Sequence, residues 1–172
     1  MANILISGVS GFLGTALVPK LLEKNHIVYG LVRADSEVSK CIANNTLFKR
    51  LPIEEGWHLQ LTDTHFDSFY HLAASYNEGD TTKDLSEFLY ANISLGLEML
   101  SLANLQPNKS PAFIYAQSYW QYFQGGNDFH PNTLYAATKE AFHALATYYN
   151  KMQKVRTMGL VVYDTYGPND KR

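Results

Sequence analysis

Hydrophobic residues near the N-terminus switch from a continuous run to helical spacing and back. "NILIS" (3–7) is a short apolar run with β-branched residues, and "FLGTALVPKLLEK" (12–24) follows with apolar residues recurring at the spacing of a helix. The first pattern predicts a buried strand and the second an amphipathic helix. "IVYGLV" (27–32) predicts another buried strand. Together they predict a parallel, right-handed strand-helix-strand unit.

The same alternation continues through the rest of the chain. Apolar runs at "YHLAA" (70–74), "AFIYAQ" (112–117) and "TMGLVVYD" (157–164) predict further strands, and the turn "GPND" follows the last one. Amphipathic patterns predict helices over about 84–104 and 132–153. Strands that alternate with helices indicate an α/β fold, a Rossmann-type doubly wound parallel sheet of three layers with helices on both faces.

Residues 34–66 have the least regular pattern. If "WHLQL" (57–61) were a strand, only a few residues would remain to carry the chain across the sheet, and they would span at most about 20 Å. We therefore expect "TLFKRLP" (46–52) to be the third strand. Residues 54–66 would then form a short crossover.

The composition indicates a single domain whose partners are small molecules or proteins. A chain of 172 residues buries about 70% of the surface that its unfolded form exposes. The net charge of -2 and the lack of a Lys/Arg cluster argue against nucleic acid or an anionic membrane. No apolar stretch approaches the roughly 20 residues that cross a bilayer. The single cysteine, Cys41, requires no oxidising compartment, so we expect a cytoplasmic protein.

A glycine motif lies between the first strand and the first helix. "GVSGFLG" places glycines at positions 8, 11 and 14, which is the context of a dinucleotide-binding turn, although GxGxxG is the commoner spacing. Small residues let the backbone turn sharply and approach a pyrophosphate, which the N-terminus of the helix attracts. This context favours dinucleotide binding over glycines that only form a tight turn. It also suits a pyrophosphate better than the mononucleotide loop of a flavodoxin-like domain.

The end of the second strand bears on which dinucleotide binds. An NAD-selective protein usually places an acid there to bind the ribose 2′-hydroxyl, but Val32 stands at that position and Arg33 follows it. A guanidinium suits a 2′-phosphate, so the sequence favours NADP(H). Asp35 is close enough to keep NAD(H) as an alternative, and Arg33 could also be a solvated loop residue.

Three polar residues form a candidate proton-transfer set. Tyr135 and Lys139 are four positions apart in a predicted helix, so their side chains share one face. Ser118 follows the predicted strand 112–117, at the sheet edge where open α/β folds bind ligands. Each residue alone has a plain structural interpretation: a solvated helix face for the pair and a turn cap for the serine. Together they indicate acid/base chemistry beside a dinucleotide. We assign no residue to a metal.

The chain contains, in this order, the motifs "GVSGFLG", "FYHLAA", "YANISLG", "FIYAQS", "LYAATK" and "YDTYGPND". They resemble the extended short-chain dehydrogenase/reductase family, in its NAD-dependent epimerase/dehydratase group. The resemblance runs from residue 3 to about 170 and is weakest over 34–66. The tail "YDTYGPNDKR" and the "YWQ" after Ser118 look more like the nucleotide-sugar 4-reductase branch, of the CDP-abequose synthase type, than like the 4-epimerases.

The resemblance implies a role for each matching residue. Tyr135 would be the general acid/base, Lys139 would lower the pKa of Tyr135 and hold the nicotinamide ribose, and Ser118 would orient the reacting oxygen. Gln117 departs from the serine or small residue usual at its position, which puts the local polar network in doubt. Asn92 would be either a structural or a cofactor-proximal polar group. The residues expected around the cofactor are Gly8, Ser10, Gly11, Phe12, Leu13, Gly14, Arg33, Leu72, Ala73, Ala74, Asn92, Tyr135 and Lys139.

The resemblance also implies a nucleotide-sugar substrate and an oxidoreductase, epimerase or dehydratase activity. A homodimer could form through the helices at 84–104 and 132–153. Members of this group normally continue into a smaller substrate domain, which would be largely absent here, so that residues 1–172 form a dinucleotide-binding domain. The alternative is a non-catalytic NADP(H)-binding sensor or scaffold module.

Overall fold

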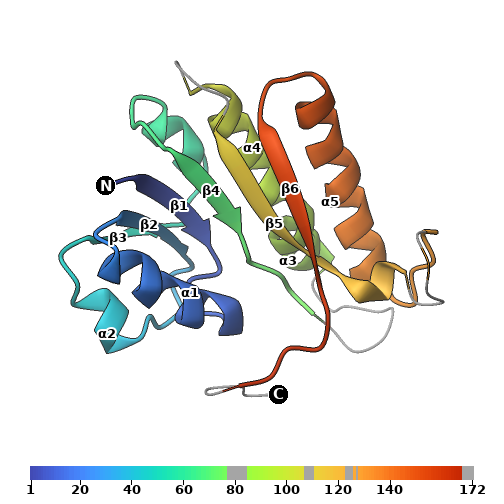
Figure 1. Ribbon diagram of the computed structural model, residues 1–172, viewed down its shortest axis with the longest axis horizontal. Coiled ribbons are helices and arrows are strands. Elements are labelled where there is room, and N and C mark those ends of the chain that lie inside the picture. The colour runs from blue at the N-terminus through green and yellow to red at the C-terminus, as the bar shows by residue number, and fades with distance from the viewer. Residues whose placement is uncertain (77–84, 107–110, 123–125, 127, 168–172) are drawn as a thin grey trace.

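In the computed structural model, residues 1–76, 85–106, 111–122, 126 and 128–167 are described. Six parallel strands form one sheet in the order β3-β2-β1-β4-β5-β6 (Figure 1). The strands are β1 (Asn3–Ser7), β2 (Ile27–Val32), β3 (Phe48–Pro52), β4 (Ser68–His71), β5 (Ala112–Ser118) and β6 (Arg156–Val162). The helices are α1 (Phe12–Glu23), α2 (Lys40–Ala43), α3 (Leu85–Leu89), α4 (Leu95–Asn104) and α5 (Leu134–Lys151).

Hydrophobic cores lie on both faces of the sheet. In β1, Ile4 and Ile6 pack in the core that includes Val18 of α1, whereas Leu5 packs in the core that includes Met99 of α4 and Phe142 of α5. Successive residues of a strand point to opposite faces, so these helices cover opposite sides of the sheet. The predicted doubly wound, three-layer α/β fold is confirmed.

The prediction for residues 34–66 is also confirmed. The third strand is Phe48–Pro52, within the expected range 46–52, and it pairs with β2. Residues Trp57–Leu61 form a 3-10 helix rather than a strand. Trp57 is buried in the core under α4. The short helix α2 was not predicted.

The fourth strand ends earlier than the predicted range 70–74. It covers Ser68–His71, and Leu72 still donates a hydrogen bond to the carbonyl oxygen of Ser7. Beyond that point β1 turns away at Gly8, where φ is 78°. The chain after Leu72 therefore has no neighbouring strand on that side and leaves the sheet.

The helix predicted at 84–104 is continuous from Leu85 to Asn104 but changes its winding. Residues Tyr90–Ser94 form a π-helical turn between α3 and α4. Such turns are rare and frequent at functional sites. Asn92 lies in this turn, where its side chain accepts a hydrogen bond from the amide of Ser75 at 2.9 Å and donates one to the Ser75 carbonyl at 3.0 Å. The turn thus fixes the segment that follows β4.

Other boundaries differ by a few residues from the predictions. Helix α5 begins after Thr133, whose hydroxyl accepts a hydrogen bond from the amide of Ala136, and ends before Gln153, where φ is 55°. Residue 84 and most of the predicted turn at 167–170 lie outside the described residues. In the part of the chain that is described, no helix is long and apolar enough to cross a bilayer. The cytoplasmic location stays a prediction.

Candidate active site

A cleft of about 740 Å³ opens at the carboxyl end of the parallel strands. The chain after β1 and the chain after β4 form its floor, at the point where the strand order changes direction. Open α/β sheets bind ligands at this kind of point. The sequence-predicted residues that line the cleft are Gly8, Ser10, Gly11, Phe12, Leu13, Gly14, Arg33, Leu72, Ala73, Ala74, Ser118, Tyr135 and Lys139.

Two of the motif glycines are required by close backbone packing. Gly8 has φ of 78°, and a Cβ there would lie 2.6 Å from the amide nitrogen of Ala73. A Cβ on Gly14 would lie 2.1 Å from the carbonyl oxygen of Gly8. Because both obstacles are backbone atoms, no side chain could be accommodated at either position without moving the turn. These glycines hold the ends of β1, β4 and α1 together.

The third glycine leaves room for a ligand. Gly11 is the N-cap of α1 and offers no side-chain cap, and a Cβ there would meet only the Gly8 carbonyl oxygen, at 3.3 Å. The N-terminus of α1 therefore faces the cleft without an acidic cap, and its first turn contains no acidic residue. Backbone amides in this arrangement attract a phosphate group. The geometry fits the diphosphate of a dinucleotide.

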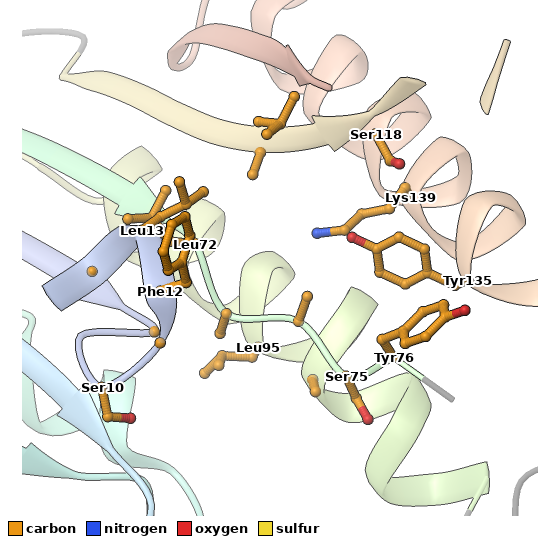
Figure 2. Close-up of a pocket in the computed structure, with 18 of the residues that line it drawn as sticks. Ser10, Phe12, Leu13, Leu72, Ser75, Tyr76, Leu95, Ser118, Tyr135 and Lys139 are labelled. Carbon is orange, nitrogen blue, oxygen red and sulfur yellow. The ribbon is translucent and has the colours of Figure 1, made fainter. Parts of the chain in front are cut away.

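Tyr135 and Lys139 project together into the cleft from α5. Figure 2 shows the phenol hydroxyl and the lysine ammonium pointing the same way into the cavity. The ammonium nitrogen lies 5.6 Å from the centroid of the Tyr135 ring. The side chains of this pair therefore share one helix face, as their spacing predicts.

Burial changes the titration of both groups. It lowers the pKa of Lys139, which is only 2% exposed, from 10.5 to about 8. It raises the pKa of Tyr135 above its ordinary value. Burial thus shifts the Tyr135 pKa in the direction opposite to the lowering expected from Lys139. The effect of Lys139 on Tyr135 stays a prediction. Tyr135 is a protonated phenol at neutral pH and is suited to give a proton.

Ser118 caps a turn and also lines the cleft, so both of its expected positions are found. Its Oγ accepts a hydrogen bond from the amide of Trp120 at 3.3 Å, so it caps the short 3-10 helix Tyr119–Gln121. Ser118 also lines the cleft. A hydroxyl that accepts one hydrogen bond still has a proton to donate, so the capping role leaves Ser118 able to bind an oxygen atom in the cleft.

A buried histidine ties β1 to β4 beneath the cleft. The Oγ of Ser7 lies 2.8 Å from Nδ1 of His71, and it accepts a hydrogen bond from the amide of Ala73 at 3.3 Å. Burial, and secondarily the charge of Lys139, lower the pKa of His71 to about 3. His71 is therefore neutral at physiological pH, and the positive charge that acts on it is that of Lys139.

Comparison with known proteins identifies the family. Residues 4–172 match the sequence model described as the NAD dependent epimerase/dehydratase family. The chain belongs to this family. It is 27% identical to CDP-abequose synthase of Yersinia pseudotuberculosis over 170 residues and 25% identical to Protein CapI of Staphylococcus aureus over 183 residues. These matches cover 99% and 96% of this chain but 58% and 55% of the two relatives.

Solved structures of other proteins have the same fold. Pal from Bacillus thuringiensis superposes with a TM-score of 0.84 at 25% identity, over 98% of this chain and 58% of that one. A UDP-glucuronic acid 4-epimerase from Bacillus cereus, solved with UDP-glucuronic acid and NAD, superposes with a TM-score of 0.78 at 23% identity, over 96% of this chain and 58% of that one. The chain thus spans a little more than half the length of these proteins.

Two expected cofactor residues lie in surroundings that the sequence did not indicate. Arg33 lines the cleft, but its guanidinium is paired with Glu87 at 2.9 Å and with Asp35 at 3.4 Å. Asn92 is fully buried, and its amide binds the backbone of Ser75. It does not line the cleft. Asn92 therefore matches the structural role that was one of its two expected roles.

Sequence reasoning missed the aromatic surroundings of Tyr135. The Tyr76 ring lies 5.6 Å from the Tyr135 ring at 89°, and the Trp120 ring lies 6.2 Å from it at 88°. Both are edge-to-face arrangements that fix the Tyr135 ring. The signal was the position of these residues, since Tyr76 comes two residues after "HLAA" and Trp120 two residues after Ser118. Glu87 gave no local signal, since its place in the cleft depends on the packing of α3.

Proposed function

We propose that this chain is the dinucleotide-binding and proton-transferring part of an NAD(P)-dependent enzyme that reduces, epimerises or dehydrates a nucleotide-activated sugar. The observation that carries the proposal is the Tyr135 hydroxyl and the Lys139 ammonium pointing together into a cleft closed by a glycine turn. A protein that only bound a dinucleotide would have no need of this pair.

The residues divide the work between binding and proton transfer. The turn at Gly8, Gly11 and the N-terminus of α1 would hold the diphosphate. When bound, the nicotinamide would give or take a hydride. Tyr135 would donate its proton to the sugar oxygen, and the Lys139 charge would stabilise the phenolate that remains. The hydroxyl of Ser118 would hold that oxygen in place.

As a protonated phenol, Tyr135 suits the reductive direction. A tyrosine that is fully protonated at neutral pH is ready to act as the general acid when a ketone is reduced. The similarity to CDP-abequose synthase fits a synthase or reductase of this kind. The activity stands as a proposal, because this chain spans 58% of the length of CDP-abequose synthase.

The test is a binding titration followed by a turnover assay. NADPH and NADH are titrated against the protein by fluorescence, and the saturated protein is then mixed with a panel of nucleotide 4-keto sugars and nucleotide hexoses. We expect micromolar cofactor binding and oxidation of the reduced cofactor by at least one keto sugar. Binding without turnover on any sugar would favour the non-catalytic sensor or scaffold module instead.

We also propose NADP(H) as the preferred cofactor, supported by Arg33 at the cleft and by the absence of an acid at Val32. Replacing Arg33→Ala should weaken NADPH binding about tenfold, because hydrogen bonds to a charged group are worth about 1.5–3 kcal/mol. NADH binding should change less than about twofold. Fluorescence titration measures both affinities. The control is Lys24→Ala, which removes the same charge at the C-cap of α1. Equal losses of NADPH and NADH affinity in Arg33→Ala would contradict the preference for NADP(H).

A homodimer through the helices at 84–104 and 132–153 is part of the proposal. Leu89 on α3 and Tyr148 and Met152 at the end of α5 are large hydrophobic residues exposed to solvent. Sedimentation velocity should detect a dimer that Leu89→Glu weakens at least tenfold. A monomer at all accessible concentrations would remove this part of the proposal.

A further inference from the structure

An ion pair joins two segments that line the cleft. Arg33 follows β2, whereas Glu87 lies in α3, beyond β4. A guanidinium nitrogen of Arg33 donates to the Glu87 carboxylate at 2.9 Å, and both residues line the cleft. Asp35 holds another guanidinium nitrogen of Arg33 at 3.4 Å. The cation at the expected 2′-phosphate position is thus already bound by two carboxylates.

This pairing has little value for stability. The side chains of Arg33 and Glu87 are each 59% exposed, and exposed ion pairs usually contribute between 0 and about 1 kcal/mol. Its consequence is for ligands that approach Arg33. A phosphate must displace Glu87 or bind beside it, and in both cases it meets a negative charge.

We propose that Glu87 is a specificity-determining residue that acts against a 2′-phosphate, so that the cleft prefers NADP(H) over NAD(H) only modestly. The inference rests on the proposed dinucleotide binding and adds a residue to it. Arg33 attracts the 2′-phosphate, and Glu87 offsets part of that attraction. A ribose with a free 2′-hydroxyl carries no charge at this position and is almost unaffected.

The geometry sets the size of the effect. Two acceptors that bind different nitrogens of one planar guanidinium lie roughly 5–8 Å apart. At that distance, even with the dielectric constant of water, about 80, a carboxylate weakens the binding of a doubly charged phosphate by the order of tenfold. The repulsion falls as salt is added, because both groups are exposed.

The test compares Glu87→Gln with the wild-type chain in NADPH and NADH titrations at low and high salt. Glu87→Gln should tighten NADPH binding about tenfold at low salt and less at high salt, with NADH affinity within about twofold. The matched control is Glu23→Gln, which removes the same charge at the other end of α1 and should change neither affinity. Thermal unfolding should show that both variants are as stable as the parent.

Asp35→Asn provides a second variant on the same cation. Asp35 pairs with Arg33 at the longer distance and does not line the cleft, so its removal should improve NADPH binding by less than Glu87→Gln does. The inference would be overturned if Glu87→Gln left the NADPH affinity unchanged, or if it changed the NADPH and NADH affinities by the same factor. Failure of the wild-type chain to bind either cofactor would instead overturn the proposed function, so the two failures are distinct.

Discussion

Tyr135→Phe should lower turnover by about 10²–10⁴-fold, the usual contribution of a positioned general acid or base. The substitution removes one oxygen atom and keeps the ring, which Tyr76 and Trp120 hold edge-to-face at 5.6 and 6.2 Å. The ring should therefore stay in place and the cleft should keep its shape. We expect the NADPH dissociation constant to change less than about threefold.

The measurement is single-turnover oxidation of bound NADPH by the keto sugar that the wild type accepts best. Tyr148→Phe is the matched control, because Tyr148 lies on the same helix and is 52% exposed, away from the cleft. Unchanged turnover in Tyr135→Phe would exclude Tyr135 as the proton donor. A parallel loss of turnover and cofactor affinity would indicate a positioning role instead.

The fold could be predicted because hydrophobic periodicity reports burial directly. The continuous apolar run of β1 predicts a strand buried on both faces, and Ile4, Leu5 and Ile6 are indeed divided between the two cores. Even in residues 34–66, where the pattern is least regular, the distance that a short connection can span selected the correct third strand. The early end of β4 could not be predicted, since it depends on where the neighbouring strand turns at Gly8.

The members of the candidate site could be predicted better than their electrostatics. Helical spacing is local, so it placed Tyr135 and Lys139 on one face. Their pKa values depend on burial by residues distant in sequence, which shifts both values and which a local pattern does not report. The pairing of Arg33 with Glu87 could not be predicted for a related reason. Glu87 is 54 positions away, and only tertiary packing brings it to the cleft.

Burial of Lys139 implies that the proposed site lowers the stability of the fold. A shift of the Lys139 pKa from 10.5 to about 8 by desolvation corresponds to about 3 kcal/mol against folding at neutral pH. Lys139→Met keeps a similar length without the charge. It should therefore raise the free energy of unfolding by about 3 kcal/mol at pH 7 and the melting temperature by about 10 °C, while hydride transfer is lost.

The pH dependence separates this cause from better packing of the methionine. Below pH 8 Lys139 is protonated in both the folded and unfolded states, so the full penalty is present. Between pH 8 and 10.5 the unfolded chain binds more protons at this residue than the folded chain, so the wild type gains stability as the pH rises. The advantage of Lys139→Met in urea unfolding should shrink across this interval, whereas Lys151→Met, at the exposed end of α5, should show no such trend. If Lys139→Met is more stable than the wild type by the same amount at every pH, then packing, not the buried charge, is responsible. If Lys139→Met is no more stable than the wild type, then the ammonium is not desolvated. A lysine kept in the core against about 3 kcal/mol is better explained by chemistry than by folding.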